Sequence, residues 1–479
     1  MSTKGDRMTS SRDDAQPVKI ESLHFIGIGG VGMSGIALIA QAAGMRVSGS
    51  DLKQTRTTRA LSEAGIEVFV GQTEANVAGR DIDVAVVSSA VPDNNPEVVA
   101  LRSRGTAIWP RARMLAWLGR GRKTLAVAGT HGKTTTSSML ATSLDRLEAD
   151  PTFLIGGVVD GYDTNAKPGS GQYYVVEADE SDGSFTYLDP YVAVVTNIEE
   201  DHLDHYEDLA DIEDAFRAFA GGHADGGAIV ACGDNPHLRE LMTDTGRTVY
   251  TYGFSQDCDL VCGNVSHDGV RMSFDVAFPD GQTAQVHLDS SPGEHNVLNA
   301  SAVLTVLWFL GYPAGLAAEA VSGFTGVRRR FDHVGRVRDV DVVDDYGHHP
   351  TEVAATIHAA SQLGYRHVHV LFQPHRYSRT QALARTWGSA FDEADSVTFM
   401  DVYSAGEAPI PGVSGKTLVD SVLSHDPRAR VAWLPHRADV APYLGERLVP
   451  GDLLLTMGAG DVTEMGPLVL EALQERDAS

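Results

Sequence analysis

The sequence predicts an α/β protein in which parallel sheets are covered by helices on both faces. Two observations carry this prediction. Short apolar runs alternate with helical patterns along nearly the whole chain, and these runs are almost continuously apolar, as buried parallel strands are. Because 479 residues are too many for one hydrophobic core, we expect several domains.

Seven apolar runs are predicted to be buried parallel strands. They lie at 23–28, 84–89, 124–129, 173–178, 192–198, 368–372 and 452–460. The region 247–290 alternates polar and apolar residues between Gly-rich turns, so antiparallel strands are expected there.

Two basic joints indicate the domain boundaries. They are GRGRK at 119–123 and GVRRRFDHVG at 326–335. We therefore predict domains at 18–120, 121–326 and 327–479. Residues 1–17 are polar and are expected to form a disordered tail.

The composition limits the class of partner. A net charge of −26 argues against a broad nucleic-acid surface, which needs clustered Lys and Arg. Three cysteines are too few for a disulfide scaffold, so a reducing cytoplasm is expected. No run approaches the roughly 18 to 20 apolar residues of a membrane helix, and the N-terminus lacks a signal-peptide core. We expect a cytoplasmic protein that binds small molecules rather than nucleic acid or membrane.

The first motif, GIGGVG, follows the strand at 23–28 and opens a helical stretch. Glycine permits a tight turn and lets backbone N–H groups approach a pyrophosphate at a helix N-terminus. The next strand ends in Asp51, where an acidic side chain meets a ribose in such folds. Ser88 and Ser89 end a later strand and are expected at the same crevice. The alternative is a glycine turn needed only for packing. The residues assigned to this site are Gly27, Gly29, Gly30, Val31, Gly32, Asp51, Ser88 and Ser89.

The second motif, GTHGKTTT, lies between a strand and a helix, as a phosphate loop requires. It has two residues between its glycines, whereas the usual loop has four. Backbone N–H groups of 130–135 would cradle phosphates, Lys133 would neutralise the β- and γ-phosphates, and Thr134 would offer its hydroxyl to Mg²⁺. The assigned residues are Gly129, Thr130, His131, Gly132, Lys133, Thr134 and Thr135.

Acidic clusters follow two more predicted strands, as EADESD at 177–182 and TNIEEDHLDHY at 196–206. In open α/β sheets, ligands lie at the carboxyl ends of strands. Glu177 and His202 are therefore predicted to reach a metal near the phosphates at Lys133. Mg²⁺ prefers oxygen ligands, so His202 is an unusual addition. The alternative is a pair of solvated loops.

GTHGKTTT, EADESDGSF and TNIEEDHLD, in this order, resemble the Mur ligase family, which builds the peptide stem of bacterial cell-wall precursors. The similarity continues through GEHNVLNA, RRRFD, DDYGHHPTE, FQPHRYSRT and MGAGD, and so covers about residues 20–465. HFIGIGGVGMSGIA is similar to the branch of the family whose substrates are UDP-N-acetylmuramate and L-alanine.

The resemblance implies an N-terminal Rossmann-like domain for the UDP-sugar, a central ATPase domain and a C-terminal Rossmann-like domain that brings the amino acid. It implies that the short loop binds ATP and that the glycine motif holds a UDP-sugar diphosphate rather than NAD. It also implies an amide synthesis through an acyl phosphate, with ATP and Mg²⁺ (or Mn²⁺) as cofactors. The expected assembly is a monomer or a homodimer.

The resemblance also assigns residues beyond the three motifs. Asn296 would contact adenine, Asp345 would meet the nucleotide, and Arg330 or its neighbour Arg329 would reach the γ-phosphate. Tyr346, His375, Arg376 and Arg379 would bind the amino acid, with an Arg clamping its carboxylate. Catalysis would rest on Lys133, Glu177, His202 and His375. The alternatives without a ligand are a helix cap at Asn296 and an exposed basic loop at 375–379.

One departure from the family separates this chain from sister enzymes that carry a carbamylated lysine. There is no Lys between Lys167 and Lys416, and the corresponding segment DIEDAFRAFAGG offers only Arg217. Three alternative functions are a murein peptide recycling ligase, a non-catalytic nucleotide sensor, and an NAD-dependent oxidoreductase. The oxidoreductase leaves GTHGKTTT and both acidic clusters unexplained, and EADESDGSF favours the alanine enzyme over the recycling ligase.

Overall fold

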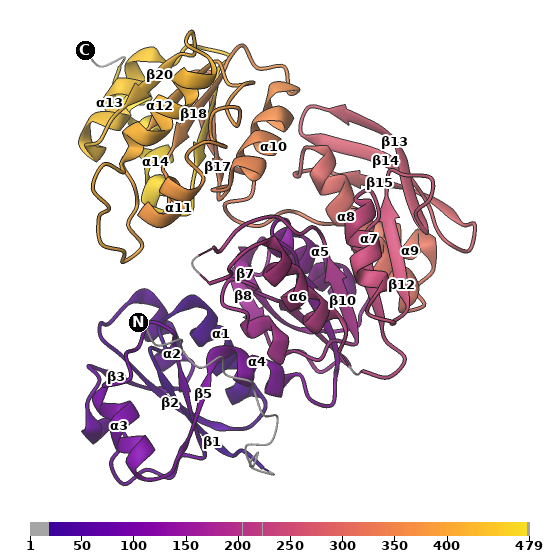
Figure 1. Ribbon diagram of the computed structural model, residues 1–479, viewed down its shortest axis with the longest axis vertical. Coiled ribbons are helices and arrows are strands. Elements are labelled where there is room, and N and C mark those ends of the chain that lie inside the picture. The colour runs from indigo at the N-terminus through magenta and orange to yellow at the C-terminus, as the bar shows by residue number, and fades with distance from the viewer. Residues whose placement is uncertain (1–18, 204, 223, 477–479) are drawn as a thin grey trace. The chain divides into compact units, whose positions relative to one another are not determined.

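The computed structural model describes residues 19–203, 205–222 and 224–476. The predicted tail at 1–17 lies outside these residues. The described residues form two compact units, which divide between Leu118 and Gly119. The first unit holds a five-stranded sheet, and the second holds a ten-stranded and a six-stranded sheet (Figure 1).

The sheet of the first unit is entirely parallel, in the order β3-β2-β1-β4-β5. Its strands are β1 Ser22–Ile26, β2 Arg46–Asp51, β3 Glu67–Val70, β4 Val84–Val87 and β5 Ala107–Pro110; its helices are α1 Val31–Ala42, α2 Arg56–Glu63, α3 Pro96–Ser103 and α4 Arg111–Leu118, with the 3₁₀ turn η1 Glu74–Asn76. The chain reverses its direction of winding between β1 and β4. Such a switch point opens a crevice at the carboxyl ends of these two strands.

The ten-stranded sheet has β6 near its middle, between β10 and β9. Its strands are β6 Lys123–Ala128, β7 Thr152–Val159, β8 Thr164–Lys167, β9 Tyr173–Glu177, β10 Val192–Val195, β11 Ala228–Cys232, β12 Val249–Gly253, β13 Leu260–Asp268, β14 Arg271–Ala277 and β15 Thr283–Leu288. Its helices are α5 Lys133–Arg146, α6 Leu209–Ala220, α7 Pro236–Thr243, α8 Glu294–Phe309 and α9 Ala314–Ser322, with η2 Ser184–Tyr187. Strands β9, β6 and β10 are parallel, so their carboxyl ends meet at one edge.

The predicted antiparallel region is confirmed for three strands and wrong for one. β13, β14 and β15 pair antiparallel, as the alternating pattern indicated. β12 instead pairs parallel with both β11 and β13. The reason is the connection: β11 and β12 are joined through α7, and a strand that returns through a helix lies parallel to the strand before it.

The six-stranded sheet runs β16-β17-β21-β18-β19-β20, and only the β16–β17 pair is antiparallel. Its strands are β16 Asp332–Val337, β17 Val340–Asp345, β18 Val368–Phe372, β19 Ser396–Phe399, β20 Val431–Trp433 and β21 Leu453–Met457; its helices are α10 Pro350–Ser361, α11 Tyr377–Ala382, α12 Gly415–His425, α13 Arg437–Arg447 and α14 Met465–Glu475, with η3 Asp461–Glu464.

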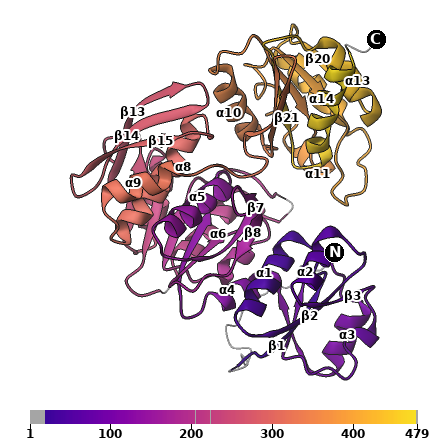
Figure 2. The same ribbon diagram turned by 180° about the vertical axis from the view of Figure 1, so that it is seen from behind.

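Both faces of this sheet are covered, which is why most side chains of β18 and β21 are apolar. Phe372 packs with α10 and α12, whereas Leu371 packs with α13 and α14. Figure 2 shows α10 and α14 on opposite sides of β21. All seven runs predicted as parallel strands form such strands: they correspond to β1, β4, β6, β9, β10, β18 and β21.

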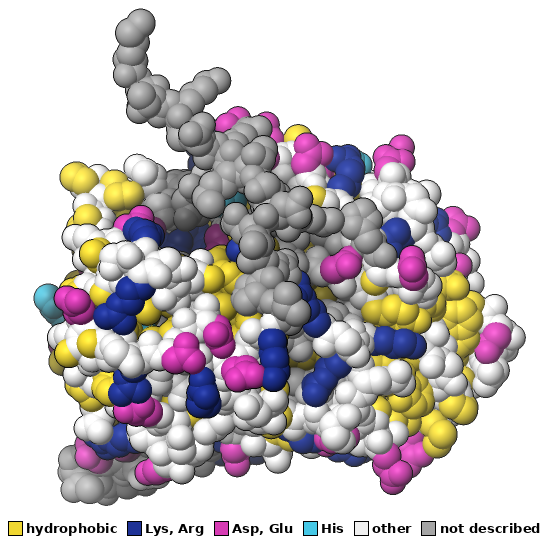
Figure 3. All heavy atoms as spheres, turned by 90° about the horizontal axis from the view of Figure 1, so that it is seen from below, with side chains coloured by type: hydrophobic (Ala, Val, Ile, Leu, Met, Phe, Trp, Pro, Cys, Tyr) yellow, Lys and Arg dark blue, Asp and Glu magenta, His cyan; other side chains and the backbone are white. Residues whose placement is uncertain are grey.

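Charged side chains of both signs are mixed on the surface drawn in Figure 3, where Lys and Arg lie among Asp and Glu rather than in a basic field. Within the ranges the structure describes, no helix has the length and apolar character needed to cross a membrane.

Candidate nucleotide and ligation site

The glycine loop of the first unit is held from beneath by the end of β2. The backbone oxygen of Ser50 accepts hydrogen bonds from the N–H groups of Gly27 (2.9 Å) and Ile28 (3.0 Å). The Asp51 carboxylate accepts from the N–H of Gly29 at 2.9 Å. Gly27 has φ +82°, a conformation that favours glycine. The structure thus uses Asp51 to shape the loop, and its contact with a ribose stays a prediction.

The N-terminus of α1 is suited to an anion. Gly30 caps the helix without a side-chain hydrogen bond, and the first turn carries no acidic residue. An anion at this end of the helix would also be favoured by the helix dipole. The Ser88 side chain lies against Gly27, 3.2 Å from where a Cβ on that glycine would stand. Its neighbour Ser89 is exposed.

Arg111, the first residue of α4, was missed by the sequence reasoning. Its guanidinium lies over Gly32, so closely that a Cβ on this glycine would collide with it. A positive side chain at the helix end of the glycine loop is what a diphosphate requires. The signal was present as an Arg at the start of the RARMLAWL helix, but nothing in the sequence tied it to the loop.

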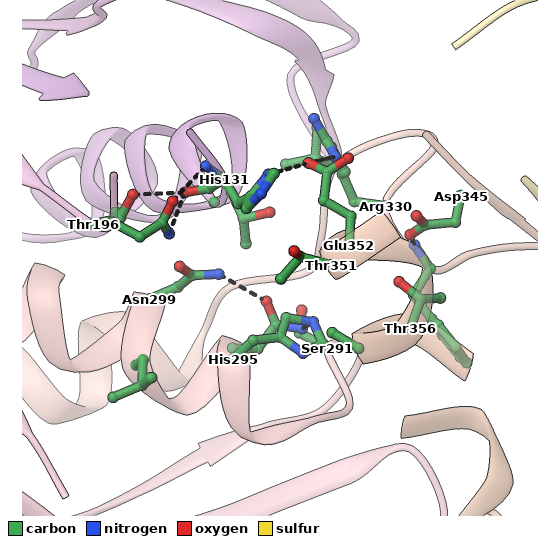
Figure 4. Close-up of a pocket in the computed structure, with 18 of the residues that line it drawn as sticks. His131, Thr196, Ser291, His295, Asn299, Arg330, Asp345, Thr351, Glu352 and Thr356 are labelled. Atoms are coloured by element: carbon green, nitrogen blue, oxygen red, sulfur yellow. Dashed lines mark hydrogen bonds and ion pairs between the residues drawn. The ribbon is translucent and has the colours of Figure 1, made fainter. Parts of the chain in front are cut away.

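The phosphate loop joins β6 to α5 and is fastened to the end of β10. The N–H of His131 donates to the Asn197 side-chain oxygen at 2.8 Å, and the Thr196 hydroxyl donates to the His131 backbone oxygen at 2.6 Å (Figure 4). Gly129 has φ +137°, and a Cβ there would collide with the Thr196 hydroxyl. These contacts hold the backbone N–H groups of the loop around the N-terminus of α5.

Lys133 lies beneath this loop and is fully paired. Its ammonium donates to the backbone oxygens of Gly129 (2.6 Å) and Thr130 (3.1 Å) and to the Glu180 carboxylate (2.8 Å). Burial alone would lower the pKa of Lys133, but the charge and hydrogen bond of Glu180 outweigh it and raise the pKa. The lysine is therefore charged at neutral pH.

Glu180 is the acid that reaches the phosphate loop, and the sequence reasoning missed it. Its side chain is buried and also lies 3.6 Å from His202 Nε2. The other carboxylate oxygen, Oε2, is buried and has no hydrogen-bond partner among the described residues. Glu177, the predicted ligand from the same segment, accepts from the N–H of Gly156 at 2.8 Å. The segment EADESD contains both Glu177 and Glu180, and the sequence alone does not show which of them contacts Lys133.

A cavity lies beside the phosphate loop, lined by the central and C-terminal parts of the second unit (Figure 4). Its lining includes His131, Asn296, Asn299, Arg330, Asp345, Thr351 and Glu352. Asn296 and Asn299 share one face of α8 as predicted, since their side chains hydrogen bond at 3.1 Å. Asn299 also accepts from Thr136 of α5 at 3.1 Å, which ties α8 to the loop helix.

His131 bridges two carboxylates at the mouth of this cavity. Its Nε2 lies 3.3 Å from Glu199 and its Nδ1 lies 3.2 Å from Glu352. Burial would lower the pKa of His131, but the two carboxylates raise it to about 9. The Thr351 hydroxyl donates to Glu199 at 2.8 Å. The charged imidazole therefore links the phosphate loop to the start of α10.

Arg329 and Arg330, which the sequence could not separate, have different neighbours. Arg329 donates to Asp344 at 3.0 Å and to the backbone oxygen of Gly458 at 2.6 Å. Arg330 lines the cavity and reaches the Thr134 hydroxyl at 3.5 Å. The geometry thus favours Arg330 as the arginine that faces a nucleotide.

Asp345 and Tyr346 stand next to these arginines. The Asp345 carboxylate accepts from the N–H groups of Phe331 (2.9 Å) and Gly347 (2.8 Å), and burial raises its pKa to about 6. The Tyr346 ring lies under both guanidiniums, 4.9 Å from Arg329 and 5.1 Å from Arg330. The contact between Tyr346 and an amino acid stays a prediction.

The segment 375–379 follows β18 and carries three basic side chains. Burial and the positive charges of Arg379 and Arg376 lower the pKa of His375 to about 4, so its imidazole is neutral at pH 7. Arg376 begins the turn into α11 with φ +67°. The Arg379 guanidinium lies 3.3 Å from Asp201, so the predicted substrate clamp is paired with a protein carboxylate in this structure.

The three sheets, the short phosphate loop and the acidic strand ends together define an ATP-dependent ligase of the Mur type. Three family descriptions match: the catalytic domain of the Mur ligase family at residues 22–123, the Mur ligase middle domain at 127–307, and the glutamate ligase domain of Mur ligases at 329–460. The chain belongs to the Mur ligase family.

Relatives within this family carry more particular names. The UDP-N-acetylmuramate–L-alanine ligase of Syntrophotalea carbinolica is 45% identical over 96% of this chain and 99% of its own. The enzyme of the same name from Acidobacterium capsulatum is also 45% identical over 96% of this chain and 99% of its own.

Two solved structures of Mur-type ligases have folds similar to that of this chain. The crystal structure of UDP-N-acetylmuramate–alanine ligase from Thermotoga maritima matches with a TM-score of 0.77 and 29% identity over 95% of this chain and 99% of that one. A murein peptide ligase from Psychrobacter arcticus matches with a TM-score of 0.70 and 26% identity over 95% of this chain and 98% of its own.

Gly129→Ala tests the phosphate loop. The added Cβ collides with Thr196 and the residue is held at a positive φ, so the loop must shift. Its backbone N–H groups then no longer point toward the phosphates. We expect ATP affinity to fall about 100-fold or more in isothermal titration, as loss of two charge-assisted hydrogen bonds would give. Gly315→Ala in α9, where a Cβ meets open space, is the control and should bind ATP normally. Equal affinities in the two variants would contradict this account of the loop.

The His131 bridge predicts a pH-dependent stability. The folded-state pKa is raised from 6.5 to about 9, so the stabilisation is fully present below pH 6.5 and is lost as the pH rises through 9. The difference in thermal midpoint between the native chain and His131→Gln should therefore shrink between about pH 6 and about pH 10. A constant difference across this range would exclude a charged bridge.

Proposed function

We propose that this chain is an ATP-dependent ligase that joins L-alanine to the lactyl carboxylate of UDP-N-acetylmuramate, a step of peptidoglycan precursor synthesis. The observation that carries the proposal is the meeting of Lys133, Glu180 and His202 at a phosphate loop. Its substrate assignment is supported by the 45% identity with the alanine ligases over 96% of the chain.

The reaction proceeds in two displacements. A carboxylate oxygen of UDP-N-acetylmuramate attacks the γ-phosphorus of ATP, the bond from that phosphorus to the ADP oxygen breaks, and an acyl phosphate forms. The amine of L-alanine then attacks the acyl carbon. The C–O bond to phosphate breaks, the nitrogen loses a proton, and the amide is complete.

The phosphate loop stabilises the charge that spreads over the transferred phosphoryl group. Lys133 holds its ammonium among backbone oxygens and Glu180, which fixes its position before ATP binds. Arg330 faces the same cavity from the C-terminal side. Because these cations are preorganised, little reorganisation is needed when the charge develops.

The residues around Glu180 fit Mg²⁺. Its buried Oε2 has no hydrogen-bond partner among the described residues, as expected of an oxygen reserved for a cation. Thr134, Glu177, Glu180 and His202 are the residues that would hold the ion. When bound, Mg²⁺ would neutralise phosphate charge, and Mn²⁺ would serve in its place.

His375, Arg376 and Arg379 are assigned to L-alanine. The low pKa of His375 leaves its imidazole neutral and weakly basic, so we assign it to positioning the incoming amine by a hydrogen bond. Arg379 binds a carboxylate already, that of Asp201. We infer that the carboxylate of L-alanine replaces Asp201 as the partner of Arg379. Until L-alanine binds, Asp201 holds the guanidinium in position.

The UDP-sugar is assigned to the first unit, where the N-terminus of α1, Ser88 and Arg111 surround the glycine loop. We assign the reaction to the cytoplasm and the assembly to a monomer or a homodimer. The substrates are small molecules, and neither nucleic acid nor membrane enters the reaction.

Phosphate release with Mg-ATP and UDP-N-acetylmuramate, with and without L-alanine, tests the proposal. We expect release to require both co-substrates and to yield one amide product per phosphate. Lys133→Ala should lower the rate about 100-fold or more, since it removes a preorganised cation. Lys416→Ala is the control, because Lys416 is exposed and paired with Asp420 on α12.

A murein tripeptide in place of L-alanine distinguishes the nearest alternative, the activity named for the Psychrobacter relative. Release with the tripeptide and none with alanine would replace the proposal by the recycling ligase. If the protein binds ATP but phosphate release does not depend on the sugar nucleotide, ligation is refuted altogether.

Arg111→Ala tests the diphosphate site. Losing a charge-assisted hydrogen bond to phosphate costs about 1.5 to 3 kcal/mol, so the KM for UDP-N-acetylmuramate should rise about 10- to 100-fold while the KM for ATP stays unchanged. Arg113→Ala on the same helix is the matched control, since its guanidinium stacks on Trp109 at 4.6 Å. An equal effect of the two variants would show that Arg111 acts only through folding.

A further inference from the structure

A second cluster of metal-binding side chains lies in the six-stranded sheet, away from the ligation site. It consists of His367, His369 and Asp452. His367 precedes β18 and Asp452 precedes β21, so the cluster is at the amino ends of these strands. His375 and Arg379 follow the carboxyl end of β18, at the opposite edge of the sheet.

The strand register brings these side chains to one face. Val368 pairs with Leu453 in parallel strands, which sets His367 beside Asp452. His367 and His369 are two residues apart and point to the same side, because side chains alternate along a strand. His369 pairs in turn with Ser396 of β19. Four polar groups therefore form a row across three neighbouring strands.

The donor atoms converge on one another. His367 Nδ1 is 2.9 Å from one carboxylate oxygen of Asp452, and His369 Nε2 is 3.1 Å from the other. One nitrogen of each imidazole and one oxygen of the carboxylate all lie within 4.8 Å of each other. Ligands of a tetrahedral Zn²⁺ at about 2.0 Å stand about 3.3 Å apart. A small movement of the side chains is enough to admit an ion.

The groups around the cluster orient it as supporting groups orient metal ligands. The Ser396 hydroxyl lies 2.7 Å from His369 Nδ1, which leaves Nε2 to face Asp452. Asp452 is buried and also accepts from the N–H of Val449 at 2.9 Å. The His367 side chain is 34% exposed, so an ion here is open to solvent and to one water ligand.

From this geometry we propose a second metal site, formed by His367, His369 and Asp452, that takes a late first-row divalent ion such as Zn²⁺. Two imidazoles and one carboxylate form a donor set that suits Zn²⁺ and disfavours Mg²⁺, which prefers oxygen. The ion fastens β18 to β21 and stabilises the C-terminal part of the chain. It takes no part in the ligation chemistry.

Metal titration of the full chain tests this site. Zn²⁺ is followed by calorimetry, and Co²⁺ by its visible absorption, which reports a tetrahedral site. We expect one equivalent of the bound ion to have both imidazoles coordinated, and the thermal midpoint to rise as that equivalent binds. His369→Ala should abolish this binding, and Ser396→Ala should weaken it about 10-fold.

A rival cluster provides the control. His131, Glu199 and His349 also bring three donor atoms together, near the phosphate loop. His349→Ala should leave the proposed site intact. Because His369 is partly buried, His367→Ala is the second variant, and metal-free thermal midpoints check that both variants fold.

Several results would overturn the proposal. One is a bound stoichiometry that is the same in the native chain, in His367→Ala and in His369→Ala. Another is binding lost only in His349→Ala. A third is the absence of any stoichiometric Zn²⁺ or Co²⁺ binding to the native chain.

Discussion

The pairing of Lys133 with Glu180 is the interaction on which the site depends. An ammonium group beneath a phosphate loop is shielded from water, and burial alone would lower its pKa and favour the neutral amine. Glu180, at 2.8 Å, keeps the lysine charged, and the backbone oxygens of Gly129 and Thr130 fix its direction. The carboxylate also lies near His202, so one acid connects the phosphate site with the predicted metal site.

This pairing requires a particular sheet. Glu180 and His202 come from the segments after β9 and β10, which flank β6 in parallel. Only with parallel strands on both sides do these three segments end at the same edge. Thr196 and Asn197 then hold the loop backbone, and Asn299 ties α8 to α5. These contacts hold the short loop in place from the neighbouring strand and helix.

The sequence predicted what local pattern encodes. Buried strands read as apolar runs, and the glycine and phosphate loops carry residues that only their turns require, so both were found. The site residues that the sequence did not reveal share a different cause. Glu180 and Glu177 are equivalent in the sequence, and only folding turns one toward Lys133 and the other toward Gly156.

The same limit applies elsewhere. Arg111 is about 80 residues from the glycine motif's end and meets it only through packing, and Glu352 meets His131 across more than 200 residues. β12 was wrongly expected to be antiparallel because alternation reveals burial of one face and not the direction of a neighbour. Arg329 and Arg330 were separable only once their contacts were known.

The central claim is that the lactyl carboxylate is activated by direct transfer of the γ-phosphoryl group. The measurement that tests it most directly follows oxygen from that carboxylate. UDP-N-acetylmuramate labelled with ¹⁸O in the lactyl carboxylate is converted with ATP and L-alanine, and the products are weighed by mass spectrometry. The account predicts one ¹⁸O in each inorganic phosphate, because the oxygen that attacks the γ-phosphorus leaves with it. Phosphate free of label, or label in AMP, would contradict it.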